Sequence, residues 1–263
     1  MDETYQTYLN RVARLTRPAS YQAQLQNIQR SPKFKRDETG TIQAVSFPGY
    51  SVVTPPWEEE PENSAFYKRL ERCQQQLIEP LDKGLLVTVP PESFHLTLAD
   101  LIWDSAYRDV QTKNPEFEPQ LRSVIDQSFQ QYNQKTSEGK PILWQLLGFM
   151  IRPRAIAVCL IPQDEDSYQR ILKLRRAIYQ NTSLIALGVE QQYHFTAHIT
   201  LGYFGDVSAE EVNRDRLSNI LSDLSMQWLE ADEPSLLITR AELRKFDDMT
   251  RYYRQPEWPA IQL

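Results

Sequence analysis

Apolar residues recur at helical spacing in several stretches of the chain. An interval of three or four residues between apolar side chains predicts an amphipathic helix. The stretches that show it carry the apolar positions Tyr5, Leu9, Val12 and Leu15; Phe66, Leu70, Cys73 and Leu77; and Ile171, Leu174 and Ile178. We therefore expect helices near the N-terminus, over about residues 63–79 and over about residues 164–180. More polar helices are expected near residues 116–133 and 208–224.

Between these helices lie runs typical of strands, which are rich in β-branched and aromatic residues and bounded by proline and glycine. Short strands are expected at residues 42–47 and 50–54, separated by "PG". The run "ILWQLLGFMIRPRAIAVCLIP" predicts two strands joined by a tight turn at Arg152–Pro153–Arg154. Extended segments are also expected over residues 85–103, around residue 198 and, as the last strand, over residues 235–247.

The chain has only three histidines, and each is followed two positions later by a threonine. In "SFHLTLAD" the alternation of a strand places His95 and Thr97 on one face and their apolar neighbours on the other. The same parity in "AHITLGY" groups His198 with Thr200. Along a strand such a pair lies roughly 6.6 Å apart. An imidazole and a hydroxyl at that spacing can both touch one small anion, such as a phosphate.

His95 and His198 are 103 residues apart, and the same offset brings other elements into register. It carries the strand predicted at residues 50–54 onto the start of "RAIAVCLIP", and it carries the helix that follows onto the later amphipathic helix. Both halves therefore run strand, helix, histidine strand. Such internal similarity favours two related lobes that each present one histidine strand. His194 does not take part in this register, and we interpret it as a residue at the entry to the strand.

The formal net charge of −6 argues against broad binding along a nucleic-acid duplex, which needs a basic face. The charge is uneven, however, since residues 1–36 carry seven Arg and Lys against two acids. A basic arm of this kind is either a solvated helical extension, which is the simpler interpretation, or a contact for an anionic partner. Together with the polar stretch that follows it, this arm predicts an N-terminal helical extension at residues 1–42. One two-lobed domain is expected at residues 43–263.

Nothing in the sequence is typical of a secreted or membrane protein. Its first residues include acids and lack the apolar core of a signal peptide. No apolar run approaches the ~18 residues of a membrane helix. The two cysteines, Cys73 and Cys159, make no disulfide framework and are interpreted as buried thiols. We expect a cytoplasmic monomer without membrane contact.

The segments "FHLTL" and "FTAHITLGY" resemble the paired H-x-[ST]-hydrophobic signatures of the two-histidine phosphoesterase superfamily, which includes the LigT-like RNA cyclic phosphodiesterases. Phe195, three places before the second histidine, and "TLG" after it also fit that family. The resemblance covers about residues 43–248. It implies an α+β fold of two pseudo-symmetric lobes, in which antiparallel sheets face each other across a central cleft and helices lie outside.

Carried over to this chain, the resemblance implies that His95 and His198 are the catalytic pair and that Thr97 and Thr200 bind the phosphate. It implies hydrolysis of a 2′,3′-cyclic or related phosphodiester of RNA or nucleotides, with neither a metal nor another cofactor. Many relatives have a basic residue directly after "TLG", where this chain has Tyr203. A tyrosine there could stack on a base, but it brings no charge to a phosphate.

The remaining phosphate-binding charge must come from elsewhere in the chain. Arg152 and Arg154, at the predicted turn, are possible substrate contacts, although each taken alone is more typical of a solvated surface. The cations interpreted as solvated include Arg244, Lys245, Arg251 and Arg254. Trp103 and Trp144 are interpreted as core residues rather than as platforms for a base.

Three functions compete at this point. Two histidines in one site favour proton transfer, and hence an RNA or nucleotide phosphodiesterase. A non-catalytic nucleotide sensor would use the same cleft, whereas an interaction protein built around the N-terminal arm leaves the histidine pairing unexplained. A zinc pair at His194 and His198 would suit a helix, but its surroundings are β-rich and have no acidic neighbour. We therefore expect no metal site, and an RNA end or a small nucleotide as the partner.

Overall fold

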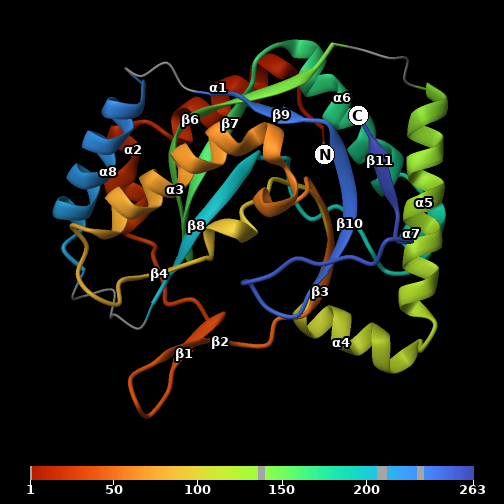
Figure 1. Ribbon diagram of the computed structural model, residues 1–263, viewed down its shortest axis with the longest axis horizontal. Helices are drawn as coiled ribbons and strands as arrows, with labels where there is room; N and C mark the ends of the chain where they lie inside the picture. The colour runs from red at the N-terminus through yellow and green to blue at the C-terminus, as the bar shows by residue number, and fades with distance from the viewer. Residues whose placement is uncertain (1, 136–139, 206–211, 230–233) are drawn as a thin grey trace.

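Two antiparallel sheets form the centre of the molecule, and helices cover them (Figure 1). The computed structural model describes residues 2–135, 140–205, 212–229 and 234–263. Within these ranges, one sheet has four strands in the order β11-β10-β3-β5, and the other has five in the order β4-β8-β7-β6-β9. Neighbouring strands in both sheets pair antiparallel. This architecture confirms the α+β fold expected from the sequence.

The strands of the four-stranded sheet are β3 (Gly49–Val53), β5 (Thr97–Trp103), β10 (Arg240–Phe246) and β11 (Ala260–Gln262). Those of the five-stranded sheet are β4 (Leu86–Thr88), β6 (Ile142–Arg152), β7 (Ala155–Pro162), β8 (His198–Phe204) and β9 (Leu236–Ile238). A separate hairpin of β1 (Phe34–Arg36) and β2 (Ile42–Ala44) projects from the body (Figure 1). The predicted turn between β6 and β7 is confirmed.

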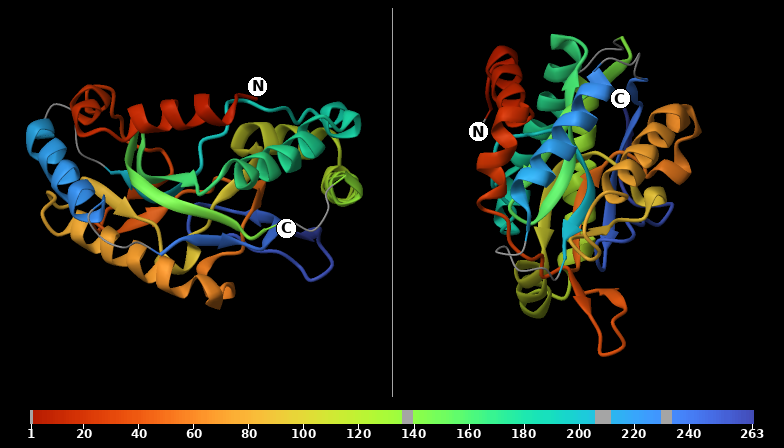
Figure 2. Two further views of the ribbon diagram at one scale, coloured as in Figure 1. Left: turned by 90° about the horizontal axis from the view of Figure 1, so that it is seen from above. Right: turned by 90° about the vertical axis from the view of Figure 1, so that its left-hand side faces the viewer.

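The helices lie on both sides of the sheets. They are α1 (Tyr5–Leu15), α2 (Pro18–Leu25), α3 (Ser64–Ile78), α4 (Asp104–Lys113), α5 (Phe117–Lys135), α6 (Glu165–Tyr179), α7 (Thr182–Ala186) and α8 (Arg214–Leu229). Short 3-10 turns occupy Trp57–Glu59, Pro61–Asn63 and Pro91–Ser93. Figure 2 shows α1 and α2 on one side of the sheets and α3 on the other.

The repeat inferred from the histidine spacing is visible in the elements. The unit β3–α3–β5 matches the unit β7–α6–β8: α3 and α6 have 15 residues each, and β5 and β8 have seven each. Within each unit the histidine strand lies beside the first strand, β5 beside β3 and β8 beside β7. The two sheets therefore form the pseudo-symmetric lobes that the sequence predicted.

The lobes are interlocked rather than consecutive along the chain. β4 joins the five-stranded sheet, although it lies between β3 and β5 of the other sheet in sequence. The single last strand predicted over residues 235–247 is wrong, because β9 and β10 are separate strands in different sheets. The apolar residues on either side of this crossing are buried alike. Periodicity alone therefore could not indicate where the chain leaves one sheet for the other.

The first helix is tied to the segment that leads into the second histidine strand. Tyr8 is fully buried, and its hydroxyl donates to the carbonyl of Leu160 at 2.8 Å and accepts from the backbone N–H of Ala197 at 3.3 Å. Arg11 donates to the carbonyl of Phe195 at 2.6 Å and to Thr196 Oγ1 at 2.7 Å. These bonds fix the backbone immediately before His198.

Several elements differ from the sequence-based expectation. Neither α2 nor α4 was predicted, because both are short, and α4 carries a single buried residue, Tyr107. β1 lies in a stretch interpreted as a polar separator. Part of the helix predicted over residues 208–224 lies outside the described residues, and α8 begins at Arg214.

Two smaller expectations concern the cysteines and the membrane. Cys73 and Cys159 are both completely buried, as the sequence suggested. None of the helices in the described ranges has the length and apolar character needed to cross a bilayer.

Candidate functional site

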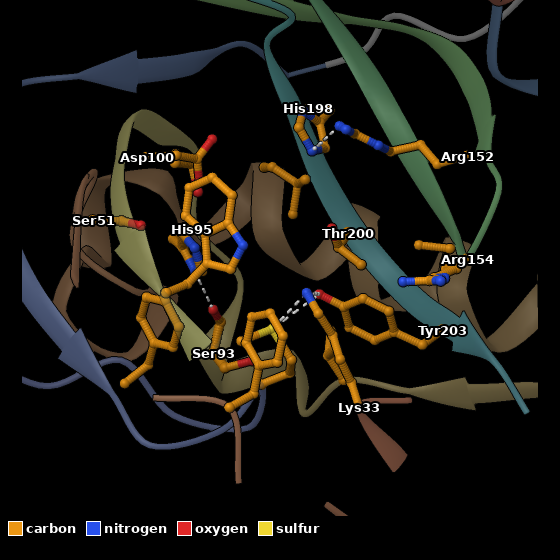
Figure 3. Close-up of a pocket in the computed structure, with 18 of the residues that line it drawn as sticks. Lys33, Ser51, Ser93, His95, Asp100, Arg152, Arg154, His198, Thr200 and Tyr203 are labelled. Carbon is orange, nitrogen blue, oxygen red and sulfur yellow. Dashed lines mark hydrogen bonds between the residues drawn. The ribbon is translucent and has the colours of Figure 1, made fainter. Parts of the chain in front are cut away.

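A cavity of about 620 Å³ is lined by residues of both sheets (Figure 3). The residues singled out from the sequence all line it: His95, Thr97, Arg152, Arg154, His198, Thr200 and Tyr203. His194 is exposed and does not belong to the lining. The fold thus brings together side chains that are more than a hundred positions apart in sequence.

The strand alternation predicted around the two histidines is present. The buried partners are Phe94, Leu96 and Leu98 on one strand and Ala197, Ile199 and Leu201 on the other. The half-buried residues of the cavity face are His95, Thr97, His198 and Thr200. His95 lies just before β5, whereas His198 is the first residue of β8. Each histidine therefore sits at the start of a strand whose apolar face is anchored in the core.

The two imidazoles are held in the same way. His95 Nδ1 lies 2.8 Å from the carbonyl oxygen of Ser93, and His198 Nδ1 lies 2.6 Å from that of Thr196. A carbonyl oxygen only accepts, so Nδ1 carries the proton in both rings. In the neutral imidazole, Nε2 is then the basic nitrogen. A carbonyl two residues back thus fixes the same tautomer in both lobes.

The surroundings lower the pKa of both histidines to about 4. For His95 the cause is burial, helped by the Arg244 charge and opposed by the Ser93 carbonyl and by Asp100. For His198 it is burial and then the Arg152 charge. Burial disfavours the charged form of an imidazole. With these pKa values both rings are neutral at pH 7.

Arg152 contacts the second histidine directly. Its Nη1 lies 3.1 Å from His198 Nε2 (Figure 3). A guanidinium can only donate, so Nε2 must be the acceptor and must be unprotonated. This agrees with the tautomer set by the Thr196 carbonyl. Arg154, at the other end of the same turn, is exposed and also lines the cavity, so the β6–β7 turn contributes two cations to the cavity.

Both histidine strands carry a bulge at the same position. β5 skips Leu98 in its pairing with β3, and β8 skips Leu201 in its pairing with β7. In a regular strand the residue five places after a histidine would point to the opposite face. A bulge shifts this parity and re-aims the following side chains. As a result Asp100 and Tyr203, each five residues after its histidine, both line the cavity.

Asp100 was missed from the sequence. It is half-buried, and the hydroxyl of Tyr193 donates to its Oδ2 at 2.8 Å. The internal repeat could have indicated Asp100, because it occupies in the first lobe the position that Tyr203 occupies in the second. The two lobes thus present different chemistry at equivalent places: a carboxylate on one side and a phenol on the other.

Aromatic side chains form much of the remaining wall. Those in the lining are Phe47, Phe94, Trp103, Tyr193, Tyr203, Phe246 and Tyr252. Trp103 was expected in the core and lines the cavity instead, whereas Trp144 is fully buried as expected. The ring of Tyr252 lies 4.1 Å from that of His95, measured between centroids. This contact brings together residues far apart in sequence, so no local signal marked it.

Arg244 was interpreted as a solvated cation, and that interpretation is wrong. Its side chain is 1% exposed and pairs with Glu242 at 2.6 Å and with Glu59 at 2.5 Å. Its Nη1 also donates to the carbonyl of Tyr252 at 3.0 Å. Arg244 therefore supports the loop whose tyrosine packs on His95, and it stays charged because two carboxylates surround it.

Lys33 is a second residue that the sequence did not indicate. It comes from the polar stretch before the hairpin, and it lines the cavity beside Tyr203 (Figure 3). Nothing in "RSPKFKRDETG" distinguishes this lysine from Lys35, because the tertiary fold alone brings it to the site. In the described part of the chain, no group of three or more His, Cys, Asp or Glu side chains could hold a metal ion.

Among comparisons with known proteins, only the search of solved structures finds similar proteins, and the similarity is one of fold. No family model matches the chain, and no curated protein matches its sequence. The structure is similar to that of ATU0111, a conserved protein of unknown function from Agrobacterium tumefaciens str. C58, with a TM-score of 0.59 and 14% identity. That match covers 90% of this chain and 96% of the other. At this identity it shows a shared fold and nothing about activity.

Other solved structures match with lower scores. E. coli LigT complexed with 3′-AMP matches with a TM-score of 0.41 and 16% identity, over 83% of this chain and 99% of that one. TT0787 of Thermus thermophilus matches with a TM-score of 0.40 and 15% identity, over 81% of this chain and 94% of that one. These scores are too low to carry an argument about function, which must come from the cavity itself.

Proposed function

We propose that this protein is a two-histidine phosphodiesterase that hydrolyses a 2′,3′-cyclic or related phosphodiester of RNA or a nucleotide, without a metal ion. The observation that carries the proposal is the pseudo-equivalent pair His95 and His198 in one cavity. Each ring is anchored through Nδ1 to a carbonyl, and each is followed on the same face by a threonine, Thr97 or Thr200. Such an arrangement suits one phosphate held from two sides.

His198 is the better candidate for the general base. Its Nε2 is unprotonated and accepts a hydrogen bond from Arg152, which must move away before the lone pair can take a proton. In the proposed reaction Nε2 takes a proton from a water molecule, whose oxygen attacks the phosphorus and forms a new P–O bond. By then Arg152 has moved its hydrogen bond from the imidazole to a phosphate oxygen, which frees Nε2 and places the guanidinium where the transition state gathers negative charge.

His95 is the better candidate for the general acid. Burial and the Arg244 charge lower its pKa, but the Asp100 carboxylate raises it, whereas the charges that act on His198 are cations that lower its pKa. As the P–O bond to the sugar breaks, His95 donates its Nε2 proton to the departing oxygen. The cyclic ester becomes a phosphate monoester, and proton exchange with solvent returns both rings to their starting states. Thr97 and Thr200 donate hydroxyl hydrogen bonds to the non-bridging oxygens.

A bound phosphodiester changes the protonation of this pair. An anion next to an imidazole favours the charged form and raises its pKa. The pKa of about 4 therefore rises when substrate binds. This allows one histidine to hold a proton while the other, beside Arg152, stays neutral. The substrate itself thus supplies part of the electrostatics that the acid needs.

The direct test is hydrolysis of nucleoside 2′,3′-cyclic phosphates and of short RNAs ending in a cyclic phosphate, in excess EDTA. Product formation is followed by chromatography or by ³¹P NMR. We expect turnover that the chelator does not reduce. Absence of turnover on all of these substrates would contradict the proposal, and so would an activity that appears only when zinc or manganese is added.

One observation favours a second candidate, a nucleotide-binding sensor without catalysis. The pKa of both imidazoles is lowered to about 4, and Arg152 occupies the nitrogen that a base would use. A sensor needs the threonines and cations but no proton transfer. It would bind nucleotides with submillimolar affinity and leave cyclic phosphates intact, so that the hydrolysis assay combined with calorimetry separates the two functions.

A further inference from the structure

Lys33 is fixed at the edge of the cavity by its backbone. The N–H of Ser31 donates to the carbonyl of Phe204 at 2.9 Å, and the N–H of Gln29 donates to the carbonyl of Pro153 at 2.6 Å. On the other side, the N–H of Val45 donates to the carbonyl of Lys33 itself at 2.9 Å. The segment is thus pinned to the end of β8 and to the turn that carries Arg152 and Arg154.

The ammonium group of Lys33 lies among aromatic rings and sulfur. Nζ is 4.5 Å from the ring centroid of Phe47 and 4.7 Å from that of Tyr203. It donates to Tyr203 Oη at 3.4 Å and to Met249 Sδ at 3.1 Å (Figure 3). Sulfur is a weak acceptor, and an ammonium has three hydrogens to donate. These partners therefore leave donor capacity for a ligand.

No carboxylate neutralises this cation. Across the described ranges Lys33 makes no ion pair, although it is half-buried and burial lowers its pKa to about 8. Of the charges around it, the Asp100 carboxylate acts most strongly and raises that pKa, whereas Arg152 and Arg154 lower it. A half-buried cation beside other cations is costly unless an anion compensates it. Asp100 acts on Lys33 without forming an ion pair with it, so an anionic ligand would supply the direct partner that the described residues do not.

The Lys33 ammonium lies on the Thr200 side of the place where the reacting phosphate would sit. The side chain of Tyr203 hydrogen-bonds to Thr200, and Lys33 donates to the Tyr203 hydroxyl at 3.4 Å. A phosphate held by both histidines and Thr200 would therefore have this ammonium next to it, and a second phosphate on that side would lie between Lys33 and Arg154. Arg154, which lines the same cavity, supplies a second cation near Tyr203 (Figure 3).

We propose that Lys33 and Arg154 form a second anion subsite, which binds an additional phosphate of a nucleotide whose first phosphate lies between the two histidines. The idea that the first phosphate lies there rests on the proposed function. The substrate class is then a nucleotide or RNA end with at least two phosphate groups.

The test compares adenosine 3′-monophosphate with adenosine 3′,5′-bisphosphate by titration calorimetry on the full-length protein. We expect the wild type to bind the bisphosphate about 10- to 100-fold more tightly, as one or two charged hydrogen bonds would give. Lys33→Met, which keeps an apolar chain against Phe47 and Tyr203, should reduce that ratio to about twofold or less. Lys33→Arg should restore a large part of it.

Lys35→Gln is the matched control, because Lys35 is an exposed lysine two residues away. It removes the same charge and should leave the ratio unchanged. Thermal unfolding of each variant verifies that it folds. Equal binding of the two nucleotides by the wild type, binding of neither, or an unchanged ratio in Lys33→Met would each overturn the subsite. A Lys33-dependent ratio in a protein that fails to cleave cyclic phosphates would leave the subsite standing and overturn the phosphodiesterase alone.

Discussion

Replacing Arg152 with methionine should raise the pKa of His198 and leave that of His95 nearly unchanged. Arg152 Nη1 lies 3.1 Å from His198 Nε2, so a proton on that nitrogen would put two cations in contact. Burial is the larger cause of the low pKa and stays in the variant. We therefore expect a rise on the order of one unit, equivalent to about 1.4 kcal/mol, which leaves the pKa below the usual 6.5.

The chain suits this measurement because it has only three histidines. Ring carbon and nitrogen resonances are followed by NMR as a function of pH, and His194→Gln removes the exposed histidine's signal for assignment. Nitrogen shifts also report the tautomer, which should be Nδ1–H for both site histidines. Arg154→Met serves as the comparison, since Arg154 makes no hydrogen bond to His198 among the contacts of the described residues.

The same variant has a consequence for the proposed reaction. Arg152 would donate a charged hydrogen bond to the phosphate in the transition state, and such bonds are worth about 1.5–3 kcal/mol. Loss of that bond corresponds to a drop of roughly 10- to 150-fold in kcat/KM. If the pKa of His198 does not move in Arg152→Met, or if that of His95 rises equally, the contact does not control His198. The assignment of His198 as the base would then fall.

Three further predictions follow from the same geometry. Alanine at His95 or at His198 should each lower turnover by at least ~100-fold, whereas His194→Ala should change turnover only slightly. An equal loss of turnover in His194→Ala would show that His194, and not His198, is the second catalytic histidine. The pH optimum of kcat/KM, which reports the free enzyme, should lie below that of kcat, because substrate raises the pKa of both site histidines; coincident optima would contradict this. Tyr8→Phe should reduce the free energy of unfolding by about 1–3 kcal/mol in denaturant titrations. The substitution leaves buried backbone groups of β7 and of the segment before β8 without their hydrogen-bond partner. An unchanged free energy of unfolding would show that the Tyr8 hydroxyl does not stabilise this segment.

The candidate histidines could be predicted from the sequence because their signal is local. The alternation of buried and half-buried side chains around His95 and His198 depends only on the period of a strand. The two histidine segments were paired because the offset between the histidines also aligns the strand and the helix that precede each of them. The equal lengths of α3 and α6 agree with this repeat. Local period and internal repetition were therefore enough to pair His95 with His198 and Thr97 with Thr200.

The remaining features depend on contacts that no local pattern encodes. Lys33 and Lys35 alternate with similar neighbours in one polar stretch, yet only Lys33 reaches the cavity. The crossing between β9 and β10 separates two apolar runs that look like one strand. Asp100 could have been predicted as a cavity residue, because the repeat aligns it with Tyr203. The bulge that turns it inward, however, breaks the parity on which the strand prediction relied.

Asp100 and Tyr203 explain how a nearly two-fold symmetric site could treat its substrate asymmetrically. The histidines, the threonines and the carbonyl anchors are equivalent in the two lobes, so a bare phosphate would find no preferred orientation between them. Five residues on, one lobe presents a carboxylate held by Tyr193, and the other presents a phenol beneath the Lys33 ammonium. A phosphate repels the first and is attracted by the second, whereas a sugar hydroxyl can donate to the carboxylate. A nucleotide with a second phosphate would therefore bind with that phosphate toward Lys33 and its donor groups toward Asp100. This orientation places the leaving sugar oxygen on the side of His95, which is the histidine that Asp100 helps to protonate.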